Sequence, residues 1–199
     1  MPYLVFDLEM SGPDPEIHDI IQVGAVLVDN DWNEIAKFES NVCPENINTI
    51  SVKAEEIHGL SKYDLLDAPA MYEVLENLEE WVKTTLKRSN TKNFHDIVLC
   101  GQGVMNDINF LQEAYYRENM KWPFAYKLID LLSISTFAFM IMKNNGLEVP
   151  KRRSLNHIAE FFDLKREGDL HNALEDAELT LACFQKCFDV AKKAKLPTE

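Results

Sequence analysis

The sequence predicts an α/β fold: a mixed five-stranded sheet with helices on both faces, in which three strands form an antiparallel meander and the later strands run parallel. Three short segments with strand patterns follow one another before residue 43, separated by short turns. Beyond residue 68, helical periodicity alternates with two short apolar runs, an order typical of α/β domains. No repeat or low-complexity linker divides the chain. We therefore expect one domain over residues 1–190 and a frayed C-terminal tail over residues 191–199.

The first three strands are expected at residues 3–10, 20–29 and 33–42. The second of these, IIQVGAVLVD, is rich in β-branched residues and ends in the turn signal DND. The third alternates polar and apolar residues, which predicts a half-exposed strand. The first is hydrophobic except for Asp7 and Glu9, two residues that a buried strand does not ordinarily contain.

The remaining elements alternate between helix and strand. An apolar stripe at helical spacing predicts a long helix over residues 69–89, formed by Met71, Val74, Leu75, Leu78, Val82 and Leu86. IVLCGQ (97–102) predicts a buried fourth strand followed by a helix, and KLIDLL (127–132) a short fifth strand that leads into another helix. Two further helices are expected at residues 154–162 and about 172–194.

The composition indicates a soluble protein that does not depend on charge to hold long nucleic acids. The net charge of −13 disfavours salt-dependent electrostatic binding to long duplex nucleic acid. It is compatible with an enzyme that binds only a few nucleotides around metal ions. No segment is apolar enough to cross a membrane and no leader peptide opens the chain, so we expect a cytoplasmic protein without a membrane partner. The four cysteines lack C-x-x-C spacing, which predicts reduced, buried thiols.

Asp7 and Glu9 lie two residues apart on the first strand, so their side chains project from the same face. Burying an unpaired carboxylate costs on the order of several kcal/mol, and two adjacent carboxylates raise each other's pKa. A divalent cation between them removes both costs, and Mg²⁺ and Mn²⁺ prefer carboxylate oxygens. D-x-E alone is a weak motif, and a solvated strand face is an equally good interpretation.

A third acidic residue, Asp107, lies in the opening turn of the helix that follows the fourth strand. Acidic residues there are stabilised by the helix dipole, so a structural role is the alternative for Asp107. The order of the elements nevertheless places this turn beside the first strand. Ligand sites of open α/β sheets lie at such strand ends.

The last motif is HNALEDAELTLACF, at the start of the final helix. Asn172 can cap this helix, with Glu175 reaching back as in a capping box, which puts Asp176 one turn into the helix. His171 lies just before the helix and can swing over the same site. Histidine is suited to accept a proton near neutral pH, although an exposed loop residue is the alternative.

These three blocks together resemble the DEDDh exonucleases, which include ribonuclease T, oligoribonuclease and the proofreading subunits of bacterial DNA polymerase III. DLEMSG, IHGLSKYDLLDAP and SLNHIAEFF extend the resemblance over nearly the whole chain. The resemblance implies a ribonuclease H-like fold and 3′-5′ exonuclease activity on single-stranded DNA or RNA, releasing nucleoside 5′-monophosphates. It also implies that Asp7, Glu9, Asp107 and Asp176 bind two divalent cations, Mg²⁺ or Mn²⁺, and that His171 takes the proton from the attacking water.

The resemblance further suggests contacts with the terminal nucleotide. Met10, His58 and Leu60 are the residues implied, although core packing is the alternative for Leu60. The basic cluster at residues 151–153 is suited to backbone phosphates, but a solvated loop before a helix is the commoner interpretation.

The sequence motifs do not decide between the subfamilies of these exonucleases. Met10-Ser11-Gly12 stands where proofreading members commonly carry Thr-Thr-Gly, and Asn106 stands where an aromatic residue is common. Ribonuclease T and oligoribonuclease suggest a homodimer, whereas proofreading subunits suggest a polymerase partner. Two other functions remain: a catalytically silent binding member of the same fold, and a hydrolase of small phosphodiesters.

Overall fold

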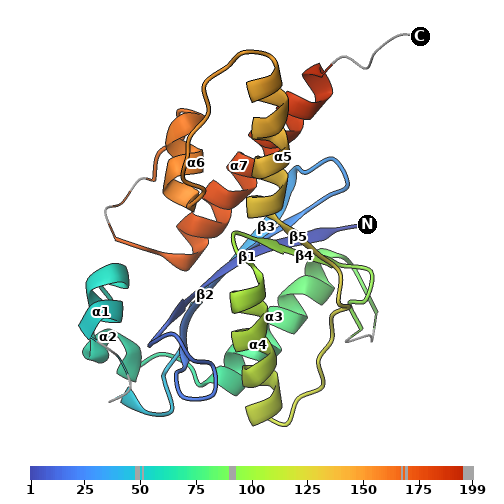
Figure 1. The fold of residues 1–199 in the computed structure, drawn as a ribbon. Helices are drawn as coiled ribbons and strands as arrows, with labels where there is room; N and C mark the ends of the chain where they lie inside the picture. The colour runs from blue at the N-terminus through green and yellow to red at the C-terminus, as the bar shows by residue number, and fades with distance from the viewer. Residues whose placement is uncertain (48–49, 51, 90–92, 167, 169, 195–199) are drawn as a thin grey trace.

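A five-stranded sheet separates two layers of helices (Figure 1). The computed structural model describes residues 1–47, 50, 52–89, 93–166, 168 and 170–194. The strands are β1 (Tyr3–Met10), β2 (Ile20–Val28), β3 (Glu34–Asn41), β4 (Val98–Gly101) and β5 (Leu128–Asp130). The helices are α1 (Val52–His58), α2 (Lys62–Leu66), α3 (Met71–Thr85), α4 (Met105–Arg117), α5 (Leu131–Asn144), α6 (Leu155–Phe161) and α7 (Ala173–Lys193).

The sheet has the strand order β3-β2-β1-β4-β5. β1 pairs with β2, and β2 with β3, in antiparallel register, while β4 runs parallel to both β1 and β5. The predicted fold class is therefore confirmed: an antiparallel meander joined to parallel strands, with helices on both faces (Figure 1).

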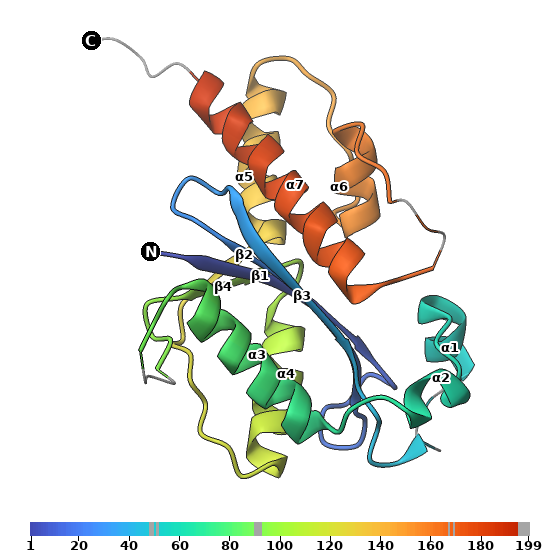
Figure 2. The same cartoon turned by 180° about the vertical axis from the view of Figure 1, so that it is seen from behind.

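Each face of the sheet carries its own apolar core. Leu4, Phe6 and Leu8 of β1 pack with side chains of α3 and α4, whereas Val5 packs with α5, α6 and α7 on the opposite face. Figure 2 shows the same two helical layers from behind. Every residue of β2 is buried because helices cover both of its faces, which explains why its sequence is apolar almost throughout.

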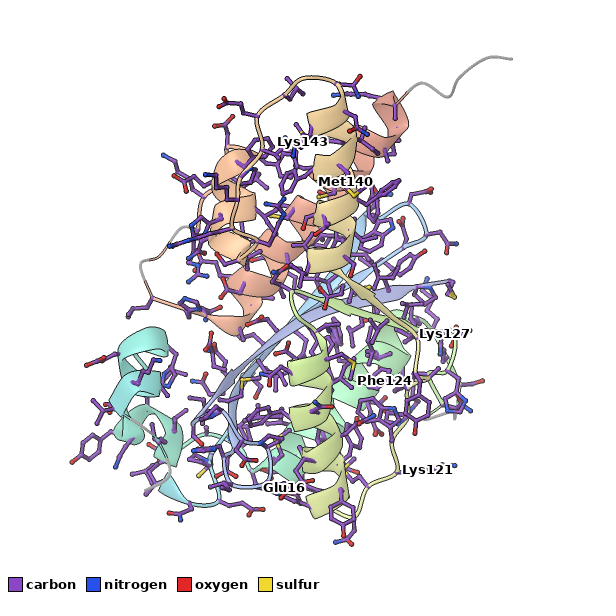
Figure 3. The ribbon with its side chains drawn as sticks, viewed as in Figure 1. Glu16, Lys121, Phe124, Lys127, Met140 and Lys143 are labelled. Carbon is purple, nitrogen blue, oxygen red and sulfur yellow. The ribbon has the colours of Figure 1, made fainter. Side chains whose placement is uncertain are left out.

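Individual side chains differ widely in how much of their surface is exposed to solvent. Phe124, in the loop before β5, is buried against its neighbours, while Met140 projects from α5 into solvent with more than half of its surface exposed (Figure 3). Among the described residues, no helix combines the length and apolar character needed to cross a membrane. The four cysteines are free thiols; three are buried and Cys43 is partly buried.

Two helices were not predicted. α1 and α2 have seven and five residues, too few for an apolar period to distinguish them from a loop. α2 is held by a local capping box, in which Ser61 and Asp64 exchange hydrogen bonds. At the other end of the chain, α7 continues to Lys193, three residues into the predicted tail. Residues 195–199 lie outside the described residues.

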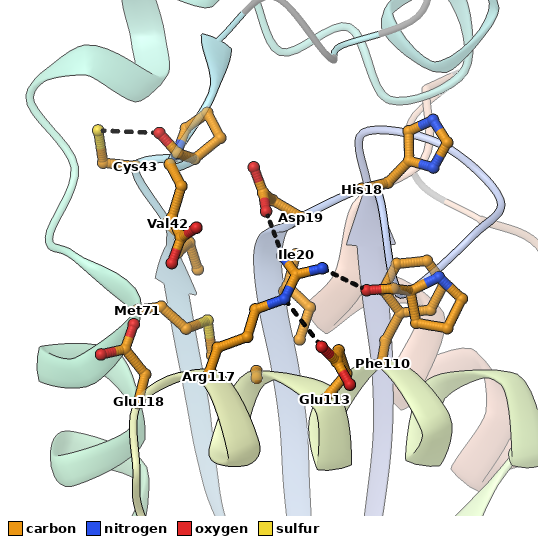
Figure 4. A pocket seen from close by; sticks show the side chains of 14 residues that line it. His18, Asp19, Ile20, Val42, Cys43, Met71, Phe110, Glu113, Arg117 and Glu118 are labelled. Carbon is orange, nitrogen blue, oxygen red and sulfur yellow. Dashed lines mark hydrogen bonds and ion pairs between the residues drawn. The ribbon is translucent and has the colours of Figure 1, made fainter.

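The loop between β1 and β2 is fastened to α4 by one arginine. The guanidinium of Arg117 contacts Asp19 Oδ1 at 3.0 Å, the carbonyl oxygen of Pro15 at 2.7 Å and Glu113 Oε1 at 3.0 Å (Figure 4). Within the loop, the backbone N–H of Asp19 donates to Ser11 Oγ at 2.9 Å. These bonds give the segment that follows Met10 a fixed path.

Candidate metal centre

β1 carries two acidic side chains toward the helices α5, α6 and α7. Asp7 lies opposite Gly24 of β2, and Glu9 lies opposite Gln22. The register shifts between Glu9 and Met10, so the strand bends where its acidic residues end. The two carboxylates therefore leave the sheet together at its carboxyl edge.

Asp107 reaches the same place from α4. β4 runs parallel to β1, and the backbone N–H of Leu8 donates a hydrogen bond to the Asp107 carboxylate, which fixes the first turn of α4 to β1. The turn before α4 is held from the other side by Asp130. Its carboxylate accepts from the backbone N–H groups of Gly103 (3.2 Å), Val104 (3.1 Å) and Leu132 (2.8 Å).

The start of α7 brings the last acidic residue and the histidine. Asn172 caps the helix as predicted, accepting a hydrogen bond of 2.9 Å from the backbone N–H of Glu175. The Glu175 carboxylate accepts a hydrogen bond of 3.0 Å from the backbone N–H of Gly168. Asp176 follows one turn into the helix, and His171 Nδ1 lies 3.2 Å from Asp176 Oδ2.

β2 holds this end of α7 in position. The side-chain Oε1 of Gln22 accepts a hydrogen bond of 2.8 Å from the backbone N–H of Ala173, the first residue of α7. Gln22 Nε2 donates to Asn41 Oδ1 at 2.9 Å. Gly24 allows the helix to lie directly on the strand, since a Cβ at Gly24 would come within 2.1 Å of the backbone of Ala173 and Leu174.

The five side chains predicted for metal binding and proton transfer line one open cavity of about 290 Å³: Asp7, Glu9, Asp107, His171 and Asp176. Ligand atoms of Glu9, His171 and Asp176 lie within 4.8 Å of one another. Glu9, Asp107 and Asp176 are 7%, 6% and 3% exposed, and the His171 side chain is 40% exposed. Solvent thus reaches the imidazole while Glu9, Asp107 and Asp176 are buried and Asp7 is partly buried.

Burial and mutual repulsion disfavour the charged forms of these acids. Desolvation, followed by the charge of Asp176, raises the pKa of Glu9 to about 7. Desolvation also raises the pKa of Asp107 to about 7 and raises the pKa values of Asp7 and Asp176. The pKa of His171 is lowered, first by desolvation and then by the charge of Arg166, so the imidazole is held neutral.

The donor set suits divalent cations. Carboxylate oxygens are the ligands that Mg²⁺ and Mn²⁺ prefer, and four of them converge here from three different elements. A cation would stabilise the ionised forms of these buried acids and so lower their pKa values. That compensation explains why three buried carboxylates and one partly buried carboxylate can share one cavity.

One positive side chain already faces the acids. Arg166 Nη2 lies 2.5 Å from Asp176 Oδ1, and Arg166 lines the same cavity. Its charge lowers the pKa values of Asp7, Glu9 and Asp176, against the effect of burial.

The predicted substrate contacts lie in different surroundings. Met10 lines the cavity. His58 is buried in α1, and burial, with a smaller contribution from His171, lowers the pKa of its imidazole. Leu60 is partly buried and packs with Ile21, Ile50 and Leu65, the core contact that was its alternative interpretation.

The basic cluster before α6 divides into two parts. Arg153 lies with its guanidinium 4.7 Å above the centre of the Phe139 ring, and its carbonyl oxygen accepts a hydrogen bond of 2.7 Å from Gln102 Nε2. The Arg153 side chain therefore packs within the protein rather than extending into solvent. Lys151 and Arg152 are exposed.

Gln22, Asp130 and Arg166 were not predicted as site residues. The partners of two of them lie far away in the chain: 151 residues separate Gln22 from Ala173, and 27 separate Asp130 from Gly103. The partners of Arg166, Asn156 and Asp176, lie on the two helices that flank it in the chain. One signal was available for Gln22, because a polar residue and a glycine interrupt the otherwise apolar run IIQVGAVLV. Nothing in the sequence marks Arg166 among its basic residues.

Comparison with known proteins gives consistent relatives. A family model described as an exonuclease matches residues 4–184. The DNA polymerase III PolC-type protein of Bacillus subtilis is 28% identical over 196 residues, which cover 96% of this chain and 12% of that protein. The DNA polymerase III subunit epsilon of Aquifex aeolicus is 28% identical over 187 residues, 94% of this chain and 80% of that protein. The chain thus spans 11–12% of the length of the PolC-type relatives it matches.

Solved structures share the fold. The nuclease domain of 3′hExo, a DEDDh family member bound to rAMP, superposes with a TM-score of 0.75 at 22% identity, over 100% of this chain and 96% of that one. E. coli exonuclease I in complex with a dA16 oligonucleotide superposes with a TM-score of 0.72 at 16% identity, over 94% and 43% of the two chains. The shared architecture therefore extends over nearly all of this chain.

Proposed function

Because the chain belongs to the DEDDh type of the 3′-5′ exonuclease family, whose members are hydrolases, we propose that it removes nucleotides one at a time from the 3′ end of single-stranded DNA or RNA and releases nucleoside 5′-monophosphates. One observation carries the proposal: Asp7, Glu9, Asp107, Asp176 and His171 line a single open cavity. All five residues that the chemistry needs are present, which favours an enzyme over a silent binding member.

The four carboxylates are proposed to hold two divalent cations, Mg²⁺ or Mn²⁺. When bound, these cations would lower the pKa of the attacking water and stabilise the leaving 3′ oxygen. The protein's own contribution is to hold the carboxylates on three elements that are fixed to one another. Glu9 and Asp7 come from β1, Asp107 from α4 and Asp176 from α7.

His171 is proposed to accept the proton of the attacking water. Its Nδ1 lies 3.2 Å from Asp176 Oδ2, so the proton of the neutral imidazole belongs on Nδ1, where it is donated to Asp176. That tautomer leaves Nε2 with a free lone pair. The lowered pKa of His171 keeps the imidazole neutral at physiological pH, as a general base requires.

Met10, His58 and Leu60 are proposed to contact the terminal nucleotide. Met10 lines the cavity and offers an apolar surface on which any base can pack. The backbone N–H of Leu60 donates to His58 Nδ1 at 3.0 Å, so neutral His58 carries its proton on Nε2. Among the described residues that buried Nε2 has no hydrogen-bond partner, which leaves a donor for substrate.

The proposed macromolecular partner is the 3′ end of a single strand. Exonuclease I of E. coli, which shares the fold, is described in complex with oligonucleotides. Because several relatives are DNA polymerase III proteins, we also propose a polymerase as a protein partner, with a second copy of this chain as the alternative assembly.

A degradation ladder tests the proposed function. RNA and DNA oligonucleotides carrying a 5′ label, single- and double-stranded, are incubated with the protein in Mn²⁺ and in EDTA. We expect single strands to shorten from the 3′ end in Mn²⁺ alone, with 5′-monophosphates as products. Asp7→Asn should abolish the ladder while the protein stays folded by circular dichroism. Degradation by this variant at the parent rate would show that the site is assigned wrongly.

The same assay separates a hydrolase of small phosphodiesters. A model phosphodiester, a dinucleotide and a longer strand are compared at equal concentration. The proposal expects turnover to favour the dinucleotide and the longer strand. Turnover of the model phosphodiester alone would overturn it.

A further inference from the structure

Arg166 occupies a position that neither the family nor the proposed chemistry explains. It precedes the loop that carries His171 and lies between α6 and α7. Its Nη2 contacts Asp176 Oδ1 at 2.5 Å and donates to Asn156 Oδ1 at 3.3 Å. Its side chain is 10% exposed, so the charge is nearly desolvated. Among the described residues, Arg166 is the only lysine or arginine that lines the cavity of the acids.

The hydrogen-bonding capacity of this guanidinium is not fully used. Arg166 Nε is buried and has no hydrogen-bond partner among the described residues. A buried guanidinium with a free donor is costly, because that donor has lost its water without gaining an acceptor. An arginine fork matches two oxygens of a phosphate, which would satisfy the remaining donors.

We propose that Arg166 exchanges partners during the reaction cycle: it pairs with Asp176 when the metal centre is empty, and it binds the phosphate of the terminal nucleotide once a divalent cation has taken Asp176. The inference rests on the proposed function, because it requires cations at the four acids and a phosphate beside them. It gives Arg166 two roles, as a counter-ion of the metal-free enzyme and as a substrate-binding residue.

The charges of the site favour this exchange. Without metal, four carboxylates face one guanidinium, so Arg166 is attracted to the acids and stabilises their ionised forms. A divalent cation on Asp176 carries twice the charge of the guanidinium and repels it. Phosphate then becomes the anion available to the displaced side chain. Asn156, which also lines the cavity, lies within hydrogen-bond distance and can guide the side chain.

Exchange and simple positioning make opposite predictions for metal binding. If Arg166 only orients Asp176 for a cation, its removal weakens metal binding. If Arg166 competes with the cation, its removal strengthens metal binding, because the cation no longer displaces a bound guanidinium. The sign of the change therefore separates the two roles without reference to activity.

The test measures two affinities. Metal-free parent protein and Arg166→Gln are titrated with Mn²⁺ by calorimetry. Each protein, saturated with Mn²⁺, is then titrated with adenosine 5′-monophosphate. For Arg166→Gln we expect Mn²⁺ to bind more tightly by about fivefold or more. We expect the monophosphate to bind more weakly by about tenfold, the loss typical of one charge-assisted contact.

Two further variants serve as controls. Lys165→Gln removes the same charge one residue away, at an exposed side chain, and should leave both affinities at the parent values. Arg166→Lys keeps the charge without the fork, so it should retain the parent Mn²⁺ affinity and recover part of the monophosphate affinity.

The possible outcomes distinguish failure of the partner exchange at Arg166 from failure of the proposed nuclease function. If Arg166→Gln binds Mn²⁺ with equal or lower affinity, or binds the monophosphate as the parent does, the exchange is wrong while the nuclease site stands. If the parent protein itself binds neither Mn²⁺ nor the monophosphate, the proposed function fails and the inference on Arg166 falls with it.

Discussion

The side-chain Oε1 of Gln22 accepts a hydrogen bond of 2.8 Å from the backbone N–H of Ala173, joining the middle of the sheet to the first turn of α7. Gln22 lies beside Glu9 in the sheet, and Ala173 lies between His171 and Asp176 in the chain. One buried amide thus links the acids on β1 to the residues on α7.

This link predicts that Gln22→Leu impairs the metal site more than it impairs the fold. Without the acceptor, the first turn of α7 is free to shift, and a displacement of about 1 Å at a catalytic group can cost about 100-fold in rate. We expect kcat and Mn²⁺ affinity to fall together, as measured by oligonucleotide turnover and calorimetry.

Gln185→Leu is the matched control. Gln185 also joins α7 to the sheet region, since its Nε2 donates to the carbonyl oxygen of Trp32 at 2.8 Å, but it lies near the other end of the helix. Because Gln185 is exposed, this variant should lose less stability than Gln22→Leu and should keep the parent turnover. Equal losses of turnover in both variants would mean that Gln22 has no special connection to the site.

Asp130→Ala tests how Asp107 is positioned. The Asp130 carboxylate accepts from three backbone N–H groups, two of them in the turn that leads into α4 and Asp107. Loss of the α5 cap alone should lower the free energy of unfolding by about 1–2 kcal/mol, measured by urea denaturation. Because Asp130 also holds the turn before α4, which positions Asp107, the variant should in addition turn over oligonucleotides more slowly.

Ser61→Ala removes another helix cap, at α2, and provides the comparison for Asp130→Ala. It should cost about 1 kcal/mol of stability and leave turnover unchanged. Asp130 would have no part in arranging the site if both variants kept full turnover after correction for the folded fraction.

The raised pKa values predict an unusual pH dependence for the metal-free protein. The pKa of Glu9 rises from 4.5 to about 7 on folding, and that of Asp107 from 3.8 to about 7. Between about pH 4 and 7 the folded state therefore binds more protons than the unfolded state, so stability falls as the pH rises through this window. Glu9 alone contributes a loss of about 3 kcal/mol, measurable by urea denaturation of chelator-treated protein at pH 5 and pH 8.

Glu9→Gln should flatten this dependence, because the amide has no proton to lose. The exposed acid Glu148, changed to Gln, should leave the dependence as in the parent. Saturating Mg²⁺ should abolish the loss at pH 8, since a cation stabilises the ionised acids and binds the folded state. Stability at pH 8 that does not respond to Mg²⁺ would argue against a metal site.

The sequence was sufficient to predict those parts of the fold that depend on local patterns. β1 and β2 follow from short apolar runs, and α7 follows from its capping residue and apolar period. Asp7 and Glu9 could be placed on one face because side chains alternate along any strand. Their meeting with Asp107 and Asp176 was expected from the order of the blocks and from the family resemblance.

The rest depends on contacts between distant segments. In the sequence, Gln22 is one polar residue in a buried strand; only the structure shows that α7 lies across it. Likewise, Arg166 resembles an ordinary surface charge in the sequence, and only the structure shows its contacts with α6 and α7. The short helices α1 and α2 have too few residues for a periodic signal. The hydrogen bond between Ala173 and Gln22 spans 151 residues, and the contacts of Arg166 depend on how α6 and α7 pack, so neither leaves a local pattern in the sequence.

The central claim is that Asp7, Glu9, Asp107 and Asp176 form one cage for divalent cations. Anomalous diffraction at the manganese edge, from crystals grown with Mn²⁺ and adenosine 5′-monophosphate, tests it most directly. We expect two anomalous peaks between these four carboxylates, with the phosphate beside them and the imidazole of His171 facing it. Peaks elsewhere on the molecule, or no peak between the four carboxylates at saturating Mn²⁺, would show that these residues do not form a metal centre.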